Sequence, residues 1–251
     1  NQLGMKRLVN QKRSGELLTH LLDYGSNLEH LLLQKNKIGD GDMRVLCDYL
    51  CEDNHLRSLD LSFNEVTPMS GEAIKTLLES NGYLKTLNLE WNELRDEGSL
   101  LVLEGLKNNN VLESINLAWC GVSSRNAPDI AIVIQENTSL AEINLENNNI
   151  EYLEGVQYIA PVLKENSSIR RLNLSSNPIG KLGVMAMLEG AKSSPSLEIS
   201  LNTVGVDWRN EILLKEMCER AFVSRRERKS EEFNILALEQ EVLLHVSKEN
   251  N

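Results

Sequence analysis

Residues 84–94 read Leu-Lys-Thr-Leu-Asn-Leu-Glu-Trp-Asn-Glu-Leu, and this arrangement of leucines and asparagine recurs along most of the chain. The apolar spacing L-x-x-L-x-L that opens it begins at positions 28, 56, 84, 112, 140 and 169, and a degenerate copy begins at 197. The steps between successive starts are therefore 28, 28, 28, 28, 29 and 28. A fixed period of roughly 20 to 50 residues is the signature of stacked structural repeats. The sequence predicts about seven repeats between residues 28 and 206.

Each unit is expected to contain a short strand followed by a helix. Leu87 and Leu89 flank Asn88, and this alternation is typical of a strand with one buried face. After the asparagine of the preceding unit, apolar residues follow helical spacing at Met69, Ala73, Ile74, Leu77 and Leu78. Neither half can bury its apolar face alone, so the units must stack. The predicted class is α/β.

A polar residue follows the last leucine of each regular unit by three positions. This position holds Asn36, Asn64, Asn92, Cys120, Asn148 and Asn177. The full pattern resembles the leucine-rich repeat family, with its signature L-x-x-L-x-L-x-x-N/C-x-L, and its length resembles the ribonuclease-inhibitor-like and RanGAP-like subclass. The resemblance covers residues 28–206 and implies a horseshoe with a parallel concave sheet and convex helices.

Two sets of asparagines have predicted structural roles. The residues after the leucines are expected to bond to the backbone of neighbouring repeats, because a buried amide needs partners. A second set precedes most of the apolar motifs, at Asn54, Asn81, Asn109, Asn137 and Asn166. Asparagine tolerates the left-handed conformation, so this set is predicted to cap the C-termini of the helices in that conformation.

The repeats are expected to have helical caps at both ends. Residues 1–27 form the predicted N-terminal cap, with a helix from Leu3 to Leu22. The last repeat is degenerate, because Leu197, Ile199 and Leu201 keep the alternation but lose one residue of spacing. Residues 207–251 are predicted to be a C-terminal helical cap or extension that either packs on the repeats or binds a partner.

Composition limits the classes of partner. The chain has 26 Lys and Arg against 37 Asp and Glu, a net charge of -11, so nucleic acid is not expected as a ligand. A protein partner with a basic patch fits this charge better. There is no apolar stretch of roughly 18 residues and no signal-peptide pattern, so no membrane span is expected. Four dispersed cysteines favour a reducing compartment, and the predicted location is the cytoplasm.

No catalytic or metal-binding pattern is present. The sequence lacks a phosphate-binding Gly-x-x-x-x-Gly-Lys loop, a His-Glu-x-x-His pair and a Gly-x-Ser-x-Gly turn. Cys47 and Cys51 lie four positions apart on one predicted helix face, but no further ligands are near them in the sequence, so they are interpreted as core thiols. The prediction is a protein that is not an enzyme, with no cofactor and no metal.

The candidate binding surface is the exposed side of the strands. Phe63, Trp91 and Trp119 occupy the same position in three consecutive repeats, although aromatics make up only 4% of the chain. Aligned aromatics on a polar surface are typical of a binding hot spot. The other candidate partner-binding residues are Asp60, Asn88, Glu90, Asn116, Asn144, Arg170 and Arg171. The alternative interpretation is that the aromatics cover the adjoining loops.

Three functional interpretations follow from these patterns. The first is a non-enzymatic protein-recognition or assembly module. Its finer hypothesis is a cytoskeletal or ciliary assembly, because the asparagine-rich, cysteine-poor repeats resemble those of cytoskeletal and ciliary members of the family. The second is a GTPase-activating regulator of a small GTPase, which the RanGAP-like resemblance implies. The third is the sensor fragment of a larger innate-immune-type receptor. Exposed repeat ends are also compatible with self-association.

Overall fold

The computed structural model describes residues 2–4, 28–53, 55–192, 194 and 196–202. The chain divides into two compact units, residues 1–207 and 208–251. All described elements belong to the first unit. The predicted C-terminal helices lie outside the described residues.

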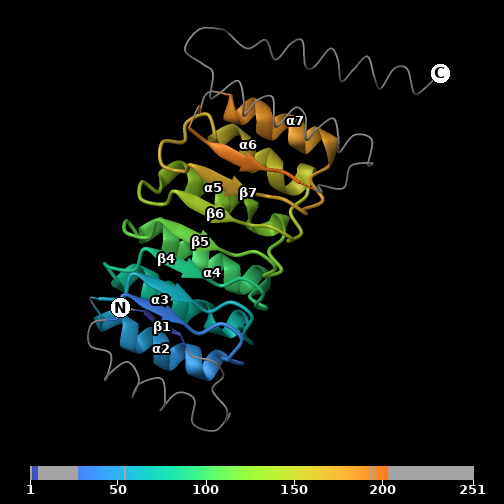
Figure 1. The fold of residues 1–251 in the computed structure, drawn as a ribbon. Coiled ribbons are helices and arrows are strands. Elements are labelled where there is room, and N and C mark those ends of the chain that lie inside the picture. The colour runs from blue at the N-terminus through green and yellow to red at the C-terminus, as the bar shows by residue number, and fades with distance from the viewer. Residues whose placement is uncertain (1, 5–27, 54, 193, 195, 203–251) are drawn as a thin grey trace, which may run out of the picture. The chain divides into compact units, whose positions relative to one another are not determined.

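The described strands form one parallel sheet in which each strand pairs with the next strand along the chain (Figure 1). They are β1 (Gln2–Gly4), β2 (His30–Leu32), β3 (Ser58–Asp60), β4 (Thr86–Asn88), β5 (Ser114–Asn116), β6 (Glu142–Asn144), β7 (Arg171–Asn173) and β8 (Glu198–Ser200). Partners in neighbouring strands are one repeat apart, as in the pair Leu59 and Leu87. The sequence period thus sets the register of the sheet.

The helices connect consecutive strands and lie on one face of the sheet (Figure 1). They are α2 (Asp40–Glu52), α3 (Gly71–Ser80), α4 (Arg95–Asn108), α5 (Ala127–Glu136), α6 (Gln157–Val162) and α7 (Gly180–Ala191), with short 3-10 turns η1 (Pro68–Ser70) and η2 (Ser124–Asn126). The inward strand residues and the helices enclose the core: Leu59, Leu87 and Ile115 are at most 2% exposed. This confirms the predicted α/β leucine-rich repeat architecture.

The asparagines after the leucines have the predicted structural role. The Asn64 side-chain nitrogen donates to the carbonyl oxygens of Leu61 in its own repeat (2.8 Å) and Leu33 in the previous one (3.0 Å). Its oxygen accepts from the backbone N–H of Ile38 at 3.0 Å. At the single cysteine position, the Cys120 thiol donates to the Leu89 carbonyl oxygen at 3.1 Å. One side chain per repeat therefore satisfies the backbone where the chain leaves the sheet.

Three members of the second set, Asn81, Asn109 and Asn137, end helices, but not in the left-handed conformation that the sequence predicted. Asn166 does not end a helix, because the residue that caps α6 is Leu163. Asn81 caps α3 with φ -81° and ψ 118°, an extended backbone. Its side-chain nitrogen donates to the Leu50 carbonyl oxygen at 2.7 Å, and its oxygen accepts from the backbone N–H of Leu84 at 2.8 Å. The amide works by linking one repeat to the next, so a left-handed backbone is not needed. Asn54 lies outside the described residues, and Asp53 ends α2 in its place.

The one longer repeat unit, between the starts at 140 and 169, absorbs its extra residue in a π-helical turn. This turn, η3 (Tyr152–Val156), precedes α6, and the Val156 N–H bonds to the Glu151 carbonyl oxygen five positions earlier at 2.8 Å. A π-turn accommodates one additional residue within a helix. The insertion leaves the register of the sheet unchanged, because Glu142 lies opposite Arg171, the equivalent residue of the next repeat, 29 positions along the chain.

Two local predictions were wrong. The helix predicted from Leu3 does not begin there, because Gln2–Gly4 forms β1, which pairs with β2. Leu3 lies opposite Leu31, at the separation found between regular repeats, so the repeat period extends to this strand. Residues 5–27 lie outside the described part of the chain. Met69, predicted to face the core, is 81% exposed because Pro68–Ser70 forms a separate 3-10 turn before α3.

A carboxylate at the start of α2 fixes this 3-10 turn. Asp40 accepts hydrogen bonds from the backbone N–H and the hydroxyl of Thr67, at 3.0 and 2.7 Å, and from the Ser70 hydroxyl. Burial acts to raise the pKa of Asp40, but the hydrogen bonds from Ser70 and Thr67 outweigh it and hold this pKa below its ordinary value of 3.8. The charged carboxylate therefore stabilises the folded state.

We expect Asp40→Asn to lower the free energy of unfolding at neutral pH by about 1 to 2 kcal/mol, because an amide cannot accept all three hydrogen bonds. A pKa lowered by folding contributes stability that is complete above the unfolded value and is lost as the pH falls through the folded value. Urea unfolding should therefore show the difference between parent and variant narrowing below pH 3.8. Asp48→Asn, on the exposed side of α2, is the control and should have little effect at either pH.

Candidate protein-binding face

The residue at which each strand turns away from the sheet has a left-handed backbone. Its φ angle is 61° at Lys35, 56° at Phe63, 55° at Trp91, 56° at Trp119, 51° at Asn147 and 58° at Ser176. The same turn therefore recurs where each repeat leaves the sheet. We call these six residues the exit column. Its side chains lie at equivalent places one repeat apart.

The three aromatic members of the exit column stack on one another. The ring centroids of Phe63 and Trp91 are 5.6 Å apart and their planes differ by 12°. Those of Trp91 and Trp119 are 4.3 Å apart with an angle of 17°. The Lys35 ammonium lies 4.9 Å from the Phe63 centroid and covers that end of the stack. The rings remain 40% to 44% exposed, so their outer parts form an accessible apolar strip, the aromatic strip.

The backbone at these positions is unfavourable for large side chains. A left-handed conformation costs an L residue other than glycine or asparagine about 1 to 2 kcal/mol. Each stacked aromatic pair returns about 0.5 to 1.5 kcal/mol beyond its buried area. Three strained positions cost about 3 to 6 kcal/mol in total, whereas the two stacked pairs return about 1 to 3 kcal/mol, so stacking offsets only about half of the strain. Stability alone gives little reason for aromatics at three consecutive exit positions.

This strain predicts an inverted order of substitutions at Trp91. We expect Trp91→Gly to be more stable than Trp91→Ala by about 1 kcal/mol, because only glycine adopts φ 55° without cost. Arg44 on the exposed side of α2 supplies the control, since glycine is less stable than alanine by about 1 kcal/mol within a helix. Chemical denaturation of the four variants measures both orders. An alanine variant at Trp91 that is the more stable of its pair would contradict the strain.

Carboxylates lie beside the aromatic strip on the face of the sheet. Glu90 accepts from the Asn116 side-chain nitrogen at 3.1 Å, and Glu146 accepts from that of Asn173 at 3.0 Å. Asp60 accepts from the Ser62 hydroxyl at 2.7 Å. Within the described residues, none of the three carboxylates forms an ion pair with Lys or Arg. The aromatic strip is therefore bordered by carboxylates, and the side chains that donate hydrogen bonds to them are neutral.

The asparagines that were predicted to bind a partner also form hydrogen bonds within the fold. The side-chain oxygens of Asn88, Asn116 and Asn144 each accept from the backbone N–H two positions later, at 3.0 Å. These bonds support the bend at the strand exit. The oxygens are thus occupied, while contact of these residues with a partner remains a prediction.

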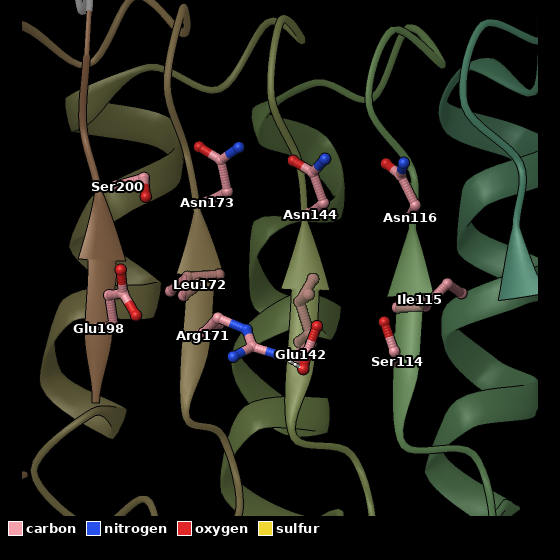
Figure 2. A pocket seen from close by; sticks show the side chains of 11 residues that line it. Ser114, Ile115, Asn116, Glu142, Asn144, Arg171, Leu172, Asn173, Glu198 and Ser200 are labelled. Carbon is pink, nitrogen blue, oxygen red and sulfur yellow. Dashed lines mark ion pairs between the residues drawn. The ribbon is translucent and has the colours of Figure 1, made fainter. Parts of the chain in front are cut away.

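Arg171 and Arg170 do not join the aromatic strip. Arg171, in β7, forms an ion pair with Glu142 in β6, and Glu198 of β8 lies on its other side (Figure 2). These three residues line a shallow depression of about 330 Å³ over β5 to β8. Arg170 precedes the strand and is exposed. The structure therefore separates the candidate residues into the aromatic strip and a charged second patch.

Several features of this face were not predicted. Two residues of this face were not among the candidates: Lys35, which covers the end of the stack, and Glu146, which lies on the border of the strip. Their positions relative to Phe63 and Glu90 follow from the repeat period. Ser62, Ala118 and Ser175 occupy the repeat position of Glu90 and Glu146, on the outward side of the alternating pattern, yet they are at most 4% exposed. These small side chains are covered by their neighbours, so alternation alone did not reveal their burial.

The described residues show no built metal site or reactive thiol. They contain no group of three or more His, Cys, Asp and Glu side chains arranged to hold a metal ion. Burial, with Cys51 and Asp48 nearby, raises the pKa of the Cys47 thiol to about 12. Burial likewise raises the pKa of Cys120 to about 12, against a backbone hydrogen bond from Asn92. Both thiols are therefore interpreted as core residues. Within the same part of the chain, no helix has the length and apolarity that a bilayer crossing requires.

Comparison with known proteins agrees with this fold. The family model described as Leucine Rich repeat matches residues 26–47, 52–75, 80–99 and 165–188. The structure titled Leiomodin-1 Actin-Binding Site 2 is similar, with a TM-score of 0.51 and 18% identity over 62% of this chain and 91% of that chain. The tropomodulin C-terminal domain of Caenorhabditis elegans gives a TM-score of 0.48 and 20% identity over 63% of this chain and 97% of that chain. Comparison with curated proteins found no match. The matched repeats, together with the period, the asparagine bonds and the parallel sheet, identify the chain as a leucine-rich repeat protein with repeats of ribonuclease-inhibitor-like length.

Proposed function

We propose that this protein is a non-enzymatic recognition module that binds a protein partner on the open face of its sheet, through the aromatic strip of Phe63, Trp91 and Trp119. The observation that carries the proposal is the stack itself: three large rings, 40% to 44% exposed, at backbone positions that disfavour them. Exposed aromatics in a rigid array supply apolar contact area at low cost in side-chain entropy. A partner that covers the strip gains this area.

The acidic border defines the kind of partner. Asp60, Glu90 and Glu146 flank the strip with carboxylates that have no described cation partner, and the whole chain has a net charge of -11. Opposite charge on the partner would steer encounter and fix its orientation. The proposal is therefore a partner with an apolar centre and basic residues around it.

The test is a quantitative pull-down with Phe63→Asn, Trp91→Asn and Trp119→Asn combined. Asparagine is chosen because Asn147 occupies the same column with φ 51°, so the substitutions suit the backbone. Tyr158→Asn on α6 is the matched control, because Tyr158 is 46% exposed and lies on the helical side of the sheet. We expect the triple variant to lose proteins that the parent and the control both retain. Identical captures from all three would overturn the proposal.

The finer proposal is a cytoplasmic module of a cytoskeletal assembly. The specific observation behind it is the structural likeness to the leiomodin-1 fragment, whose title describes an actin-binding site. Co-sedimentation with actin filaments tests it directly: the parent should pellet with filaments and the triple variant should remain in the supernatant. A parent that stays in the supernatant at saturating filament concentration would contradict the actin assignment and leave the recognition proposal to the pull-down.

A further inference from the structure

We infer that the element recognised by the aromatic strip is an amphipathic α-helix carrying two basic side chains about two turns apart, and that it lies across the strands along the stack. The inference rests on the proposed function and adds the secondary structure, direction and charge pattern of the partner segment. Its grounds are the spacing of the repeats and the positions of the carboxylates.

The strip presents one contact per repeat at a nearly constant spacing. Ring centroids are 5.6 Å and 4.3 Å apart, close to the roughly 4.8 Å between neighbouring strands of a sheet. The small interplanar angles of 12° and 17° keep the three rings nearly parallel. A partner segment that follows this strip must therefore offer side chains about every 5 Å.

A helix meets this requirement better than an extended segment. Residues three and four apart on one helix face are separated by about 4.5 and 6 Å along the axis, which brackets the repeat spacing. An extended strand places side chains on one face about 6.6 Å apart, so it drifts by more than one third of a repeat at each step. Across Phe63, Trp91 and Trp119 only the helix keeps one apolar side chain over each ring.

The acidic border adds the charge pattern. Glu90 and Glu146 belong to repeats two apart, a separation of about 9.6 Å at the spacing of strands. Helix residues seven apart lie about 10.5 Å apart along the axis and on the same face. Basic residues at these two positions would therefore face both carboxylates. Lys35 at the Phe63 end disfavours a cation there, so the basic residues belong toward Trp119.

The experiment uses the whole chain and three synthetic peptides of about twenty residues, long enough for a helix to form. The first has an alanine framework with leucines three and four positions apart and two arginines seven apart. The second has the same composition apart from one central proline that breaks the helix. The third replaces both arginines with glutamate. Binding is measured by calorimetry at low and moderate salt, and circular dichroism establishes the helicity of each peptide.

We expect the basic helical peptide to bind at least tenfold more tightly than either other peptide. Glu90→Gln with Glu146→Gln should weaken it about tenfold while keeping the acceptors for Asn116 and Asn173. The control, Glu97→Gln with Glu136→Gln, removes the same charge from exposed helix positions and should not weaken it. Any one of four results would overturn the inference: equal affinity for the basic helical peptide and the proline peptide, tighter binding of the acidic peptide, an equal loss of affinity in both double variants, or no binding of any peptide. The pull-down with the triple asparagine variant decides the proposed function separately.

Discussion

Asn92→Ala is expected to lower the free energy of unfolding by about 3 kcal/mol, because alanine leaves several buried backbone groups without their partner and each such group costs about 1 to 3 kcal/mol. The Asn92 side chain, 4% exposed, donates to the carbonyl oxygens of Leu61 (3.0 Å) and Leu89 (2.9 Å) and accepts from the N–H of Val66 at 3.1 Å. Urea denaturation at neutral pH measures the loss.

The chain supplies its own control for this substitution. Cys120 occupies the equivalent position one repeat later and donates to the Leu89 carbonyl oxygen at 3.1 Å. Asn92→Cys keeps a weak donor and more of the volume, so its loss should fall clearly below that of alanine. Two variants of equal stability, or an alanine variant within about 0.5 kcal/mol of the parent, would show that the asparagine bonds contribute little.

Gly190→Val is expected to cost about 3 kcal/mol or more, because it forces two packed helices apart. Gly190 lies in α7, where a Cβ atom would overlap the Ala160 carbonyl oxygen of α6. The obstacle is backbone, so α6 and α7 must separate to admit any side chain. Thermal and urea unfolding should both show the loss, and a smaller loss for Gly190→Ala should follow the smaller side chain.

Gly41→Ala is the opposite case. It lies in α2, and no atom is within 4 Å of a Cβ built at this residue. Alanine should therefore stabilise the protein by about 0.5 to 1 kcal/mol through its higher helix propensity. If Gly190→Ala were also neutral or stabilising, the close approach of α6 and α7 would be wrong.

The sequence predicts the repeats well because their physics is periodic. Buried leucines, the asparagine bonds and the strand register all depend on positions separated by one repeat, as in Leu59 and Leu87. Departures from the period were harder to place. The 29-residue step showed that one unit contains an extra residue, but it did not predict that this residue enters a π-turn at Tyr152–Val156. Whether an extra residue is accommodated in a helix or in a loop depends on tertiary packing rather than on the local sequence pattern.

Prediction of the candidate site was limited by backbone conformation. The column of Phe63, Trp91 and Trp119 was apparent in the sequence, and the structure adds its left-handed backbone and the ring stacking. Neither property follows from residue type, because aromatic residues rarely adopt positive φ. Arg171 was assigned to the same surface, yet its ion pair with Glu142, the equivalent residue of the preceding repeat, places it in the second patch.

The aromatic strip is best tested by the affinity of the captured partner for the parent and for the triple variant Phe63→Asn, Trp91→Asn, Trp119→Asn, with urea unfolding of both proteins. We predict binding about a hundredfold weaker or more, because truncating a hot-spot aromatic typically costs about 2 kcal/mol of binding or more. We also predict that the triple variant remains cooperatively folded. A folded triple variant with the affinity of the parent would contradict the proposed binding face and show that the exposed rings serve only to cover the strand exits.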